Sequence, residues 1–410
     1  HPAFGLLPRP LGAGAVRGDI PTKSVHRGKR CPRNNDTPST TRASGDPQAR
    51  ITPAFLSRHP IGARYPPPLS PRPIPLNIDV NDNLVNENFG DIMITLTPDD
   101  VRARFGPLFS MKYLAMVDQK AGLAEIREHC RARGTIEWDA ANRVRAGGAI
   151  QSCHVEGTTM TMLARLGVSP AKFGAAGLEI GGQALEGVEV DGDEVVTIWS
   201  GIAGAGVGVA ACLTQAPGVI RAEYPTEEDL RIGGARVCRV RIVSPLYEKV
   251  TIGIDDTDTR EEGATWVLAL KCAEACTLGG VEYLDMRLVQ LNPAVPKKTT
   301  NCVGSALNFA VRPGRVDALL EYVRDFIESE AVSNDTGIAV YRGIAFAEES
   351  PYMKRVKTEL LTLDEAEAEA ARMGVRFIDS NRRKGRIGAL GAVLWGNKGV
   401  EAAGLYGETF

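Results

Sequence analysis

The stretch VTIGIDDTDTREEGATW, residues 250–266, decides the fold of this chain, because it joins an apolar strand to a cluster of acids and then to a helix. Apolar residues at positions 250, 252 and 254 alternate with small or hydroxyl residues, which predicts a β-strand. Asp255, Asp256 and Asp258 follow at its carboxyl end, where open α/β sheets bind their ligands. Adjacent carboxylates repel one another and lose solvation when buried, so we expect a cation or a dense set of donors beside them.

The chemistry of the cluster suits a magnesium ion. Mg²⁺ is a hard ion that takes one or two carboxylates and completes its shell with water and substrate phosphate. We therefore predict that Asp255, Asp256 and Asp258 bind Mg²⁺. The alternative is a solvated acidic turn in which Asp258 or Thr259 caps the following helix. The apolar residues that flank the cluster so closely favour the metal site.

A basic loop follows a second predicted strand. In RLVQLNPAVPKKTTNCVG, residues 287–304, the strand ends in Asn-Pro and a proline-spaced loop follows. Lys298 and Thr299 in this loop are donors suited to phosphate oxygens or to an anionic intermediate. Taken alone, the segment also fits a solvated basic loop.

Two further segments carry the same pattern of polar residues next to a strand or helix. Residues 333–341 (SNDTGIAVY) place Asn334 in a turn before a strand. Residues 381–396 (NRRKGRIGALGAVLWG) give four cations and a glycine-rich entry, at Gly385, to an apolar helix. Acidic and basic loops that recur at strand ends within one region predict a site for Mg²⁺ together with a polyphosphate.

The region after residue 247 alternates strands with helices, which predicts a mixed α/β (α+β) fold. The predicted strands are 250–254, 281–293, 337–343 and 375–380, and the predicted helices are 263–280, 316–329 and 363–374. We place a domain boundary near residue 245. On this division residues 246–410 form one domain, and residues 93–245 form a glycine-rich α+β domain whose role the sequence does not indicate.

The glycine-rich region contains its own signals. Thr97 as N-cap, followed by proline and acids, predicts a helix over residues 97–106. Residues 112–118 alternate like a strand, and residues 121–134 fit either a helix or an edge strand. Residues 200–213 (SGIAGAGVGVAACL) predict a small-residue helix whose glycines serve either phosphate binding or close packing.

The first 76 residues differ from the rest in composition. They hold 15 of the 25 prolines and 12 Lys and Arg against 3 Asp and Glu. Such a segment cannot bury enough apolar surface to fold, so we predict that residues 1–80 are disordered, or are translated from upstream of the true start. A basic arm for nucleic acid is the alternative. The remaining chain has 36 Lys and Arg against 47 Asp and Glu, a net charge of −11, which argues against a grip on long nucleic acid.

The eight cysteines show no CxxC pair, which predicts a reduced, cytoplasmic protein. His129, Cys130, Cys153 and His154 offer four zinc ligands, but buried free cysteines are common, so zinc is the less favoured interpretation. The chain has no run of 18 apolar residues, and we expect no membrane span.

In their order along the chain, IGIDDTD, the following Gly-Ala-Thr-Trp, RLVQLNPAVPKKT, SNDTGIAV and GRIGALGAV resemble the catalytic domain of the archaeal tRNA-isoleucine agmatinylcytidine synthetases. These motifs span about residues 250–394. The whole of residues 93–410 also resembles the methanogenesis marker protein 11 family of methanogenic archaea.

The resemblance to the synthetases implies ATP and Mg²⁺ as cofactors. On this basis Asp256, Thr265 and Lys298 are the implied catalytic residues, with Thr265 at the position of the synthetases' autophosphorylated threonine. The implied ATP-binding residues are Asp255, Asp258, Thr299, Asn334 and Gly385. The chain departs from the synthetase pattern at Trp266, which replaces one of two consecutive threonines, and in the basic loop, where an arginine is lost.

These observations predict an ATP- and Mg²⁺-dependent phosphotransferase or ligase-like protein of methanogenic archaea, linked to methanogenesis or to maturation of its machinery. Its acceptor would be a small molecule or a protein. Two alternatives stay open: a non-catalytic nucleotide-binding assembly factor with a partner protein, and an RNA-modifying enzyme. The acidic body disfavours tRNA as the acceptor.

Overall fold

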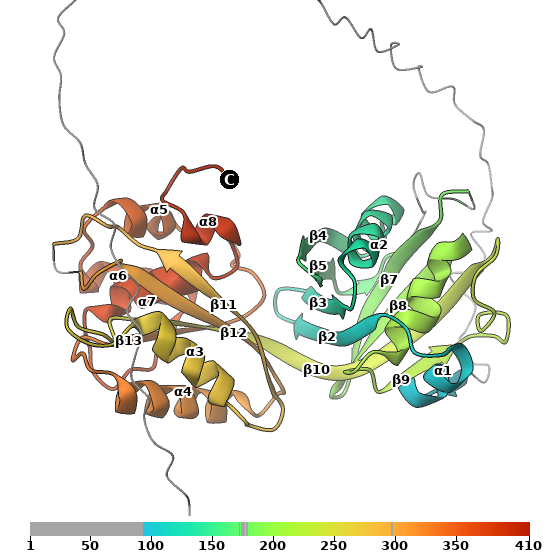
Figure 1. Ribbon diagram of the computed structural model, residues 1–410, viewed down its shortest axis with the longest axis horizontal. Coiled ribbons are helices and arrows are strands. Elements are labelled where there is room, and N and C mark those ends of the chain that lie inside the picture. Colours follow the sequence, from blue (N-terminus) through green and yellow to red (C-terminus); the bar gives the residue numbers. More distant parts are fainter. Residues whose placement is uncertain (1–92, 172, 174–176, 178, 297) are drawn as a thin grey trace, which may run out of the picture. The chain divides into compact units, whose positions relative to one another are not determined.

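The computed structural model describes residues 93–410 except residues 172, 174–176, 178 and 297 (Figure 1). The segment predicted to be disordered or mis-called lies outside these residues. The predicted mixed α/β class is confirmed, because strands and helices alternate through the described chain. Among the helices described, none combines the length and the apolar character needed to cross a membrane.

The structure contains a branched set of hydrogen-bonded strands and several helices. The strands are β1 (Ile94–Leu96), β2 (Ser110–Asp118), β3 (Leu123–Cys130), β4 (Ile150–Glu156), β5 (Thr159–Arg165), β6 (Gly167–Val168), β7 (Gly182–Asp191), β8 (Glu194–Ile202), β9 (Arg221–Tyr224), β10 (Val237–Asp255), β11 (Val281–Gln290), β12 (Val303–Val311), β13 (Gly337–Arg342) and β14 (Arg376–Phe377). The helices are α1 (Pro98–Phe105), α2 (Arg133–Ala146), α3 (Thr265–Ala275), α4 (Val316–Glu330), α5 (Pro351–Thr358), α6 (Leu363–Met373), α7 (Gly385–Trp395) and α8 (Val400–Ala403).

Strand β10 is 19 residues long and pairs with different strands along its two halves. Its first half pairs antiparallel with β8 and β9, and its second half pairs antiparallel with β12 on one edge and β13 on the other. The sequence predicted a strand over residues 250–254, and the structure extends that strand back to Val237 without a break. Because β10 runs without a break through residue 245, the domain boundary near that residue stays a prediction.

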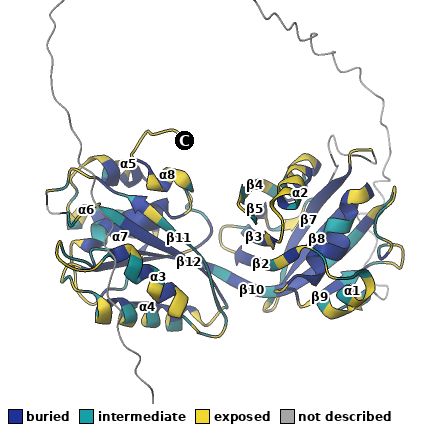
Figure 2. Cartoon of the chain, in the orientation of Figure 1, coloured by how far each residue is buried: buried dark blue, intermediate teal, exposed yellow. Residues whose placement is uncertain are grey.

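The second half of β10 lies at the centre of a sheet covered by helices on both faces (Figure 1). Its residues 250, 252 and 254 point toward α3 and α4 and are fully buried with them. The opposite face carries α7, which approaches closely at Gly253. A Cβ atom at Gly253 would lie 2.1 Å from the carbonyl oxygen of Ala389, so only glycine fits there. In Figure 2 the strands are mostly buried and the outer helix surfaces are exposed.

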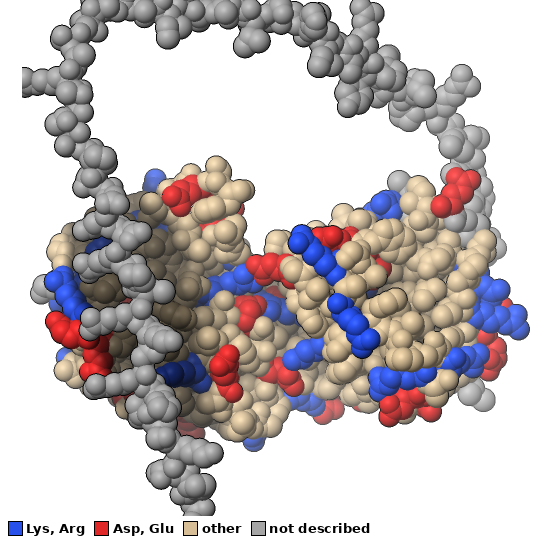
Figure 3. All heavy atoms as spheres, in the orientation of Figure 1, with Lys and Arg blue, Asp and Glu red and all other residues tan. Residues whose placement is uncertain are grey.

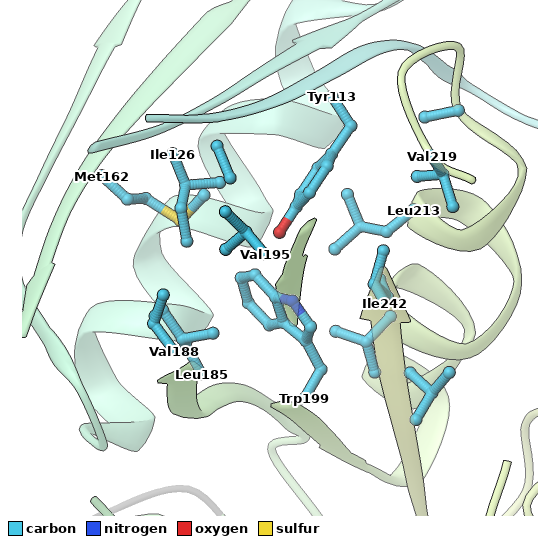
Figure 4. Close-up of a cluster of buried hydrophobic side chains, with 14 of the residues drawn as sticks. Tyr113, Ile126, Met162, Leu185, Val188, Val195, Trp199, Leu213, Val219 and Ile242 are labelled. Atoms are coloured by element: carbon cyan, nitrogen blue, oxygen red, sulfur yellow. The ribbon is translucent and has the colours of Figure 1, made fainter. Parts of the chain in front are cut away.

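The strands from β2 to β8 enclose a second core around Trp199, which is fully buried (Figure 4). Tyr113 of β2 points toward Trp199, and its hydroxyl lies 2.8 Å from Oγ1 of Thr197. Burial raises the pKa of Tyr113 to about 12, so the phenol stays protonated. Helix α2, which the sequence did not predict, packs against β7 and β4 and contributes Arg143 to this core.

Several local predictions for residues 93–245 can be compared with the structure. The helix over residues 97–106 is confirmed as α1, where Thr97 and Asp100 form a reciprocal capping box. Residues 121–134, left open between helix and strand, form β3 and then enter α2. The helix predicted over residues 200–213 is present from Ala203, after the end of β8, as a continuous helical stretch of 3₁₀, α and π turns that runs to Gln215.

Two glycines of residues 200–213 lie in close contact with neighbouring side chains. A Cβ at Gly206 would lie 2.8 Å from Sγ of Cys238, and one at Gly208 would lie 2.1 Å from Nε2 of Gln183. Both contacts are shorter than a real Cβ tolerates, so these glycines are required by their neighbours. Close packing therefore accounts for Gly206 and Gly208, whereas a Cβ at Gly204 would meet nothing within 4 Å.

Candidate functional site at the carboxyl end of β10

The chain leaves the sheet abruptly after β10. Asp256 has a φ of 56°, in the left-handed region that few residues other than glycine adopt. Neighbouring backbone and side chains hold this turn. Oγ1 of Thr336 donates to the carbonyl oxygen of Asp256 at 3.2 Å, and the N–H of Val332 donates to the carbonyl oxygen of Thr257 at 3.0 Å. Such a conformation persists only where surrounding contacts enforce it, and in proteins it often marks a functional site.

The side chain of Asp255 lies against the first turn of α7. A Cβ at Gly388 would lie 1.8 Å from Oδ2 of Asp255, and a Cβ at Gly385 would lie 2.9 Å from the Asp255 carbonyl oxygen. The N–H of Gly385 donates to the carbonyl oxygen of Asp335 at 2.8 Å. Helix α7 begins without a side-chain cap, but the N–H groups of Arg386 and Ile387 in its first turn also donate to backbone carbonyl oxygens, at 3.2 and 3.0 Å.

Asp258 lies at the start of a different helix, α3. Thr265, the first residue of α3, donates its hydroxyl to Oδ1 of Asp258 at 3.2 Å and accepts from the N–H of Thr257 at 3.2 Å. Oγ1 of Thr299 lies 3.4 Å from the same Asp258 oxygen. Helix α3 also lacks a side-chain cap. The uncapped N-terminus of α3 and three carboxylates therefore meet where β10 ends, an arrangement suited to phosphate groups accompanied by a cation.

The carboxylates of this site are strained electrostatically. Burial, and then the charges of Asp256 and Asp258, raise the pKa of Asp255 well above its usual value. Burial, followed by the charges of Asp335 and Asp258, raises the pKa of Asp256 to about 6, while Lys384 opposes this shift. A bound cation would offset the repulsion that these pKa values reflect.

The pKa of Asp256 predicts how stability depends on pH. Its folded value of about 6 lies above the ordinary 3.8, so the folded state binds the extra proton and is favoured at low pH. That contribution is complete below about pH 4 and is lost as the pH rises through about 6. In urea unfolding with EDTA, we expect the unfolding free energy of the metal-free protein to fall by about 2 kcal/mol more over this pH range than that of Asp256→Asn. Equal pH slopes in the two proteins would contradict the prediction.

The donors fit a hard divalent ion, although not as one three-carboxylate set. Carboxylate and hydroxyl oxygens are the ligands that Mg²⁺ prefers, and buried carboxylates with raised pKa values need a counter-charge. Within the described residues, however, no three His, Cys, Asp or Glu side chains gather as ligands. Asp255, Asp256 and Asp258 are therefore not gathered as one set of ligands, and their binding of Mg²⁺ stays a prediction. The turn at Asp256 directs Asp255 toward α7 and Asp258 toward α3, so one or two carboxylates plus phosphate would form the shell.

The remaining predicted residues are placed less centrally. Nζ of Lys298 donates to the carbonyl oxygen of Pro293 at 2.6 Å, within its own loop. Asn334 is exposed, and its side chain makes no hydrogen bond among the described residues. The zinc alternative gains no support either, since the described part of the chain contains no cluster of metal ligands and the thiol of Cys130 instead lies 2.9 Å from Oγ1 of Thr135.

Sequence reasoning missed Thr257, Cys302 and Gly388, whereas Asp335, Thr336 and Lys384 lie in the two polar segments that the sequence did indicate. Cys302 also has a left-handed backbone, and burial followed by the charges of Asp255 and Asp256 raises the pKa of its thiol to about 11. One signal was available, because Gly385 and Gly388 are three residues apart and therefore share one face of a helix.

Comparison with known families shows that part of this site lies in a segment similar to a known domain. A family model described as the TiaS TCKD domain matches residues 251–318. The chain is 33% identical over 283 residues to the uncharacterized protein MJ0921 of Methanocaldococcus jannaschii, covering 68% of this chain and 91% of that protein. It is 29% identical over 154 residues to the tRNA-isoleucine 2-agmatinylcytidine synthetase TiaS of the same organism, covering 35% of this chain and 36% of the synthetase.

Other relatives match the same part of the chain. The TiaS of Haloquadratum walsbyi is 41% identical over 85 residues, or 20% of this chain and 18% of the synthetase. Among solved structures, the complex of TiaS with its isoleucine tRNA and ATP is similar with a TM-score of 0.33 and 25% identity, covering 36% of each chain. The chain thus spans about a third of the length of the synthetases from M. jannaschii and Pyrococcus horikoshii that it matches.

Proposed function

This chain belongs to the same family as the uncharacterized protein MJ0921 of Methanocaldococcus jannaschii, and we propose that it is an enzyme that uses ATP and Mg²⁺ to modify RNA. One observation carries the proposal. The buried hydroxyl of Thr265 is held between Asp258 and Thr257 at an uncapped helix start, inside the segment that is similar to the TiaS TCKD domain. The relatives that match this segment are tRNA-isoleucine 2-agmatinylcytidine synthetases, which supports RNA as the substrate class.

The residues of the site have distinct roles in this proposal. The N–H groups at the start of α3 would bind phosphate oxygens, and Lys384, which faces Asp256, would add positive charge. Asp255 or Asp258 would hold Mg²⁺, which when bound neutralises phosphate charge. Asp258 orients the Thr265 hydroxyl and is placed to accept its proton. The burial of Thr265 and Asp255 keeps water away from these groups.

The first test is ATP turnover by the full chain with and without total tRNA. We expect turnover that requires Mg²⁺, that tRNA raises about tenfold or more, and that Asp256→Asn removes, because phosphoryl transfer depends on positioned charge. Glu401→Gln, on the short helix α8, is the matched control and should behave like the wild type. Equal, metal-independent turnover by the wild type and by Asp256→Asn would contradict the proposal.

A second candidate is phosphoryl transfer to a small molecule or a protein. The net charge of −11 outside the first 76 residues favours it, and Figure 3 shows basic and acidic side chains interspersed on the face in view. Mg²⁺-dependent ATP turnover that tRNA does not stimulate would support this candidate. ATP binding without turnover would instead support the assembly-factor alternative. A link to methanogenesis, and membership of the marker protein 11 family, rest on resemblance and stay predictions.

A further inference from the structure

Two exposed apolar side chains lie at the rim of the charged site. Trp266 is 44% exposed and Val332 is 43% exposed. They come from different parts of the chain, and Gly263, whose φ is 89°, lies close to Val332 and to Asp258. A Cβ at Gly263 would lie 3.1 Å from Cγ2 of Val332 and 3.0 Å from Cβ of Asp258, and Trp266 follows three residues later in the first turn of α3. The site thus has an apolar border next to its acids.

The orientation of Trp266 follows from the helix. Consecutive residues of an α-helix point about 100° apart, so when Thr265 turns inward its neighbour turns outward. Thr265 is 5% exposed and bonds to Asp258, whereas Trp266 presents its ring to solvent. Within the described residues the ring of Trp266 has no aromatic or cation partner, unlike Trp199 and Trp395, each of which has a cation over its ring.

A single exposed apolar residue is ordinary on a protein surface. Here two of them border the one place where a phosphorylated ligand is proposed to bind. A nucleotide combines charged phosphates with a flat, apolar base, and Trp266 beside Thr265 matches that combination. Once the phosphates are bound, the base is tethered close to this rim, so its local concentration there is high.

We propose that Trp266 and Val332 form the base-binding surface of the nucleotide site, with the indole ring stacking on the base. This inference rests on the proposed function, because it takes the acid cluster as the phosphate site. Stacking on an indole uses the π-face that every base has and needs no hydrogen-bond pattern. ATP and GTP should therefore bind with similar affinity, and the presence of a base should matter more to affinity than its identity does.

Calorimetry on the full chain tests the inference with two probes, Mg²⁺–ATP and Mg²⁺–tripolyphosphate. Trp266→Ala should weaken ATP binding about tenfold and leave tripolyphosphate binding within about twofold, since only ATP carries a base. Trp266→Phe should keep most of the ATP affinity. Trp138→Ala is the matched control, because Trp138 is a 51% exposed tryptophan on α2, and it should change neither affinity.

Each other outcome has a definite meaning. ATP affinity that is unchanged in Trp266→Ala would overturn the inference while leaving the proposed function in place. An equal loss for ATP and tripolyphosphate would also overturn it, because it would show that the substitution damages the start of α3. If the wild type binds tripolyphosphate as tightly as ATP, the inference of a base-binding surface is wrong, while the proposed function stands. If the wild type binds neither probe, the proposed function fails, and the base-binding surface fails with it.

Discussion

Replacing Thr265 by valine is expected to lower the ATP turnover rate by about 100-fold or more, because it removes a group placed where phosphoryl transfer is proposed to occur. Valine has nearly the shape of threonine, so the packing at the start of α3 should survive. The hydroxyl that donates to Asp258 and accepts from the N–H of Thr257 would be lost. Thr265→Ser keeps a hydroxyl and should retain turnover within about tenfold of the wild type.

The measurement is kcat and KM for ATP in the presence of Mg²⁺. A loss confined to kcat would show that the hydroxyl acts in the reaction, whereas a rise in KM alone would show that it only binds ATP. Thr358→Val is the control, because that hydroxyl donates to the carbonyl oxygen of Lys354 on the exposed side of helix α5. A Thr265→Val protein with the wild-type kcat would exclude the proposed role of this residue.

The second large effect is expected on stability, at the buried Arg143 of α2. Its Nη1 donates to Oε2 of Glu128 at 2.7 Å and its Nε to Oε1 of Gln183 at 3.0 Å. Its guanidinium carbon lies 4.8 Å from the centre of the Trp199 ring. Arg143→Met would leave the Glu128 carboxylate buried without its partner, which typically costs about 3–5 kcal/mol of unfolding free energy. Urea unfolding at neutral pH measures this loss.

A double variant separates the lost charge pairing from the lost packing. Arg143→Met combined with Glu128→Gln removes both charges and should recover a large part of the stability. Arg133→Met is the control on the same helix, because its ion pair with Glu137 is largely exposed and should contribute less than about 1 kcal/mol. A double variant no more stable than Arg143→Met would show that packing, and not the unpaired carboxylate, dominates.

Much of the second half of the chain could be predicted from local patterns. The alternation at residues 250–254 predicts the central strand, and the helix predicted over residues 316–329 is α4. The structure also brings Asp255, Asp258, Thr265, Thr299 and Gly385 to one end of β10. These predictions succeeded because each depends on residues close together in sequence, or on strand ends that a sheet brings together.

The rest depends on contacts that no local pattern contains. The left-handed turn at Asp256 is held by Thr336, 80 residues away, so this turn could not be foreseen from the local sequence. The requirement for glycine at Gly388 becomes visible only once α7 lies against Asp255. Helix α2 was missed because its apolar spacing is weak and it is held by buried polar contacts such as those of Arg143.

Strand β10 should tolerate insertions and deletions poorly in related sequences. Side chains of a strand alternate between its two faces, so one inserted or deleted residue anywhere between Leu246 and Ile254 would send every later side chain to the opposite face. Asp255 would then leave α7, and Val250 would lose its place against α3 and α4. The first half of the same strand pairs with β8, so a compensating shift in that half would disturb this pairing. A substitution in this strand, Gly253 excepted, changes one side chain, whereas an inserted or deleted residue moves every side chain that follows it.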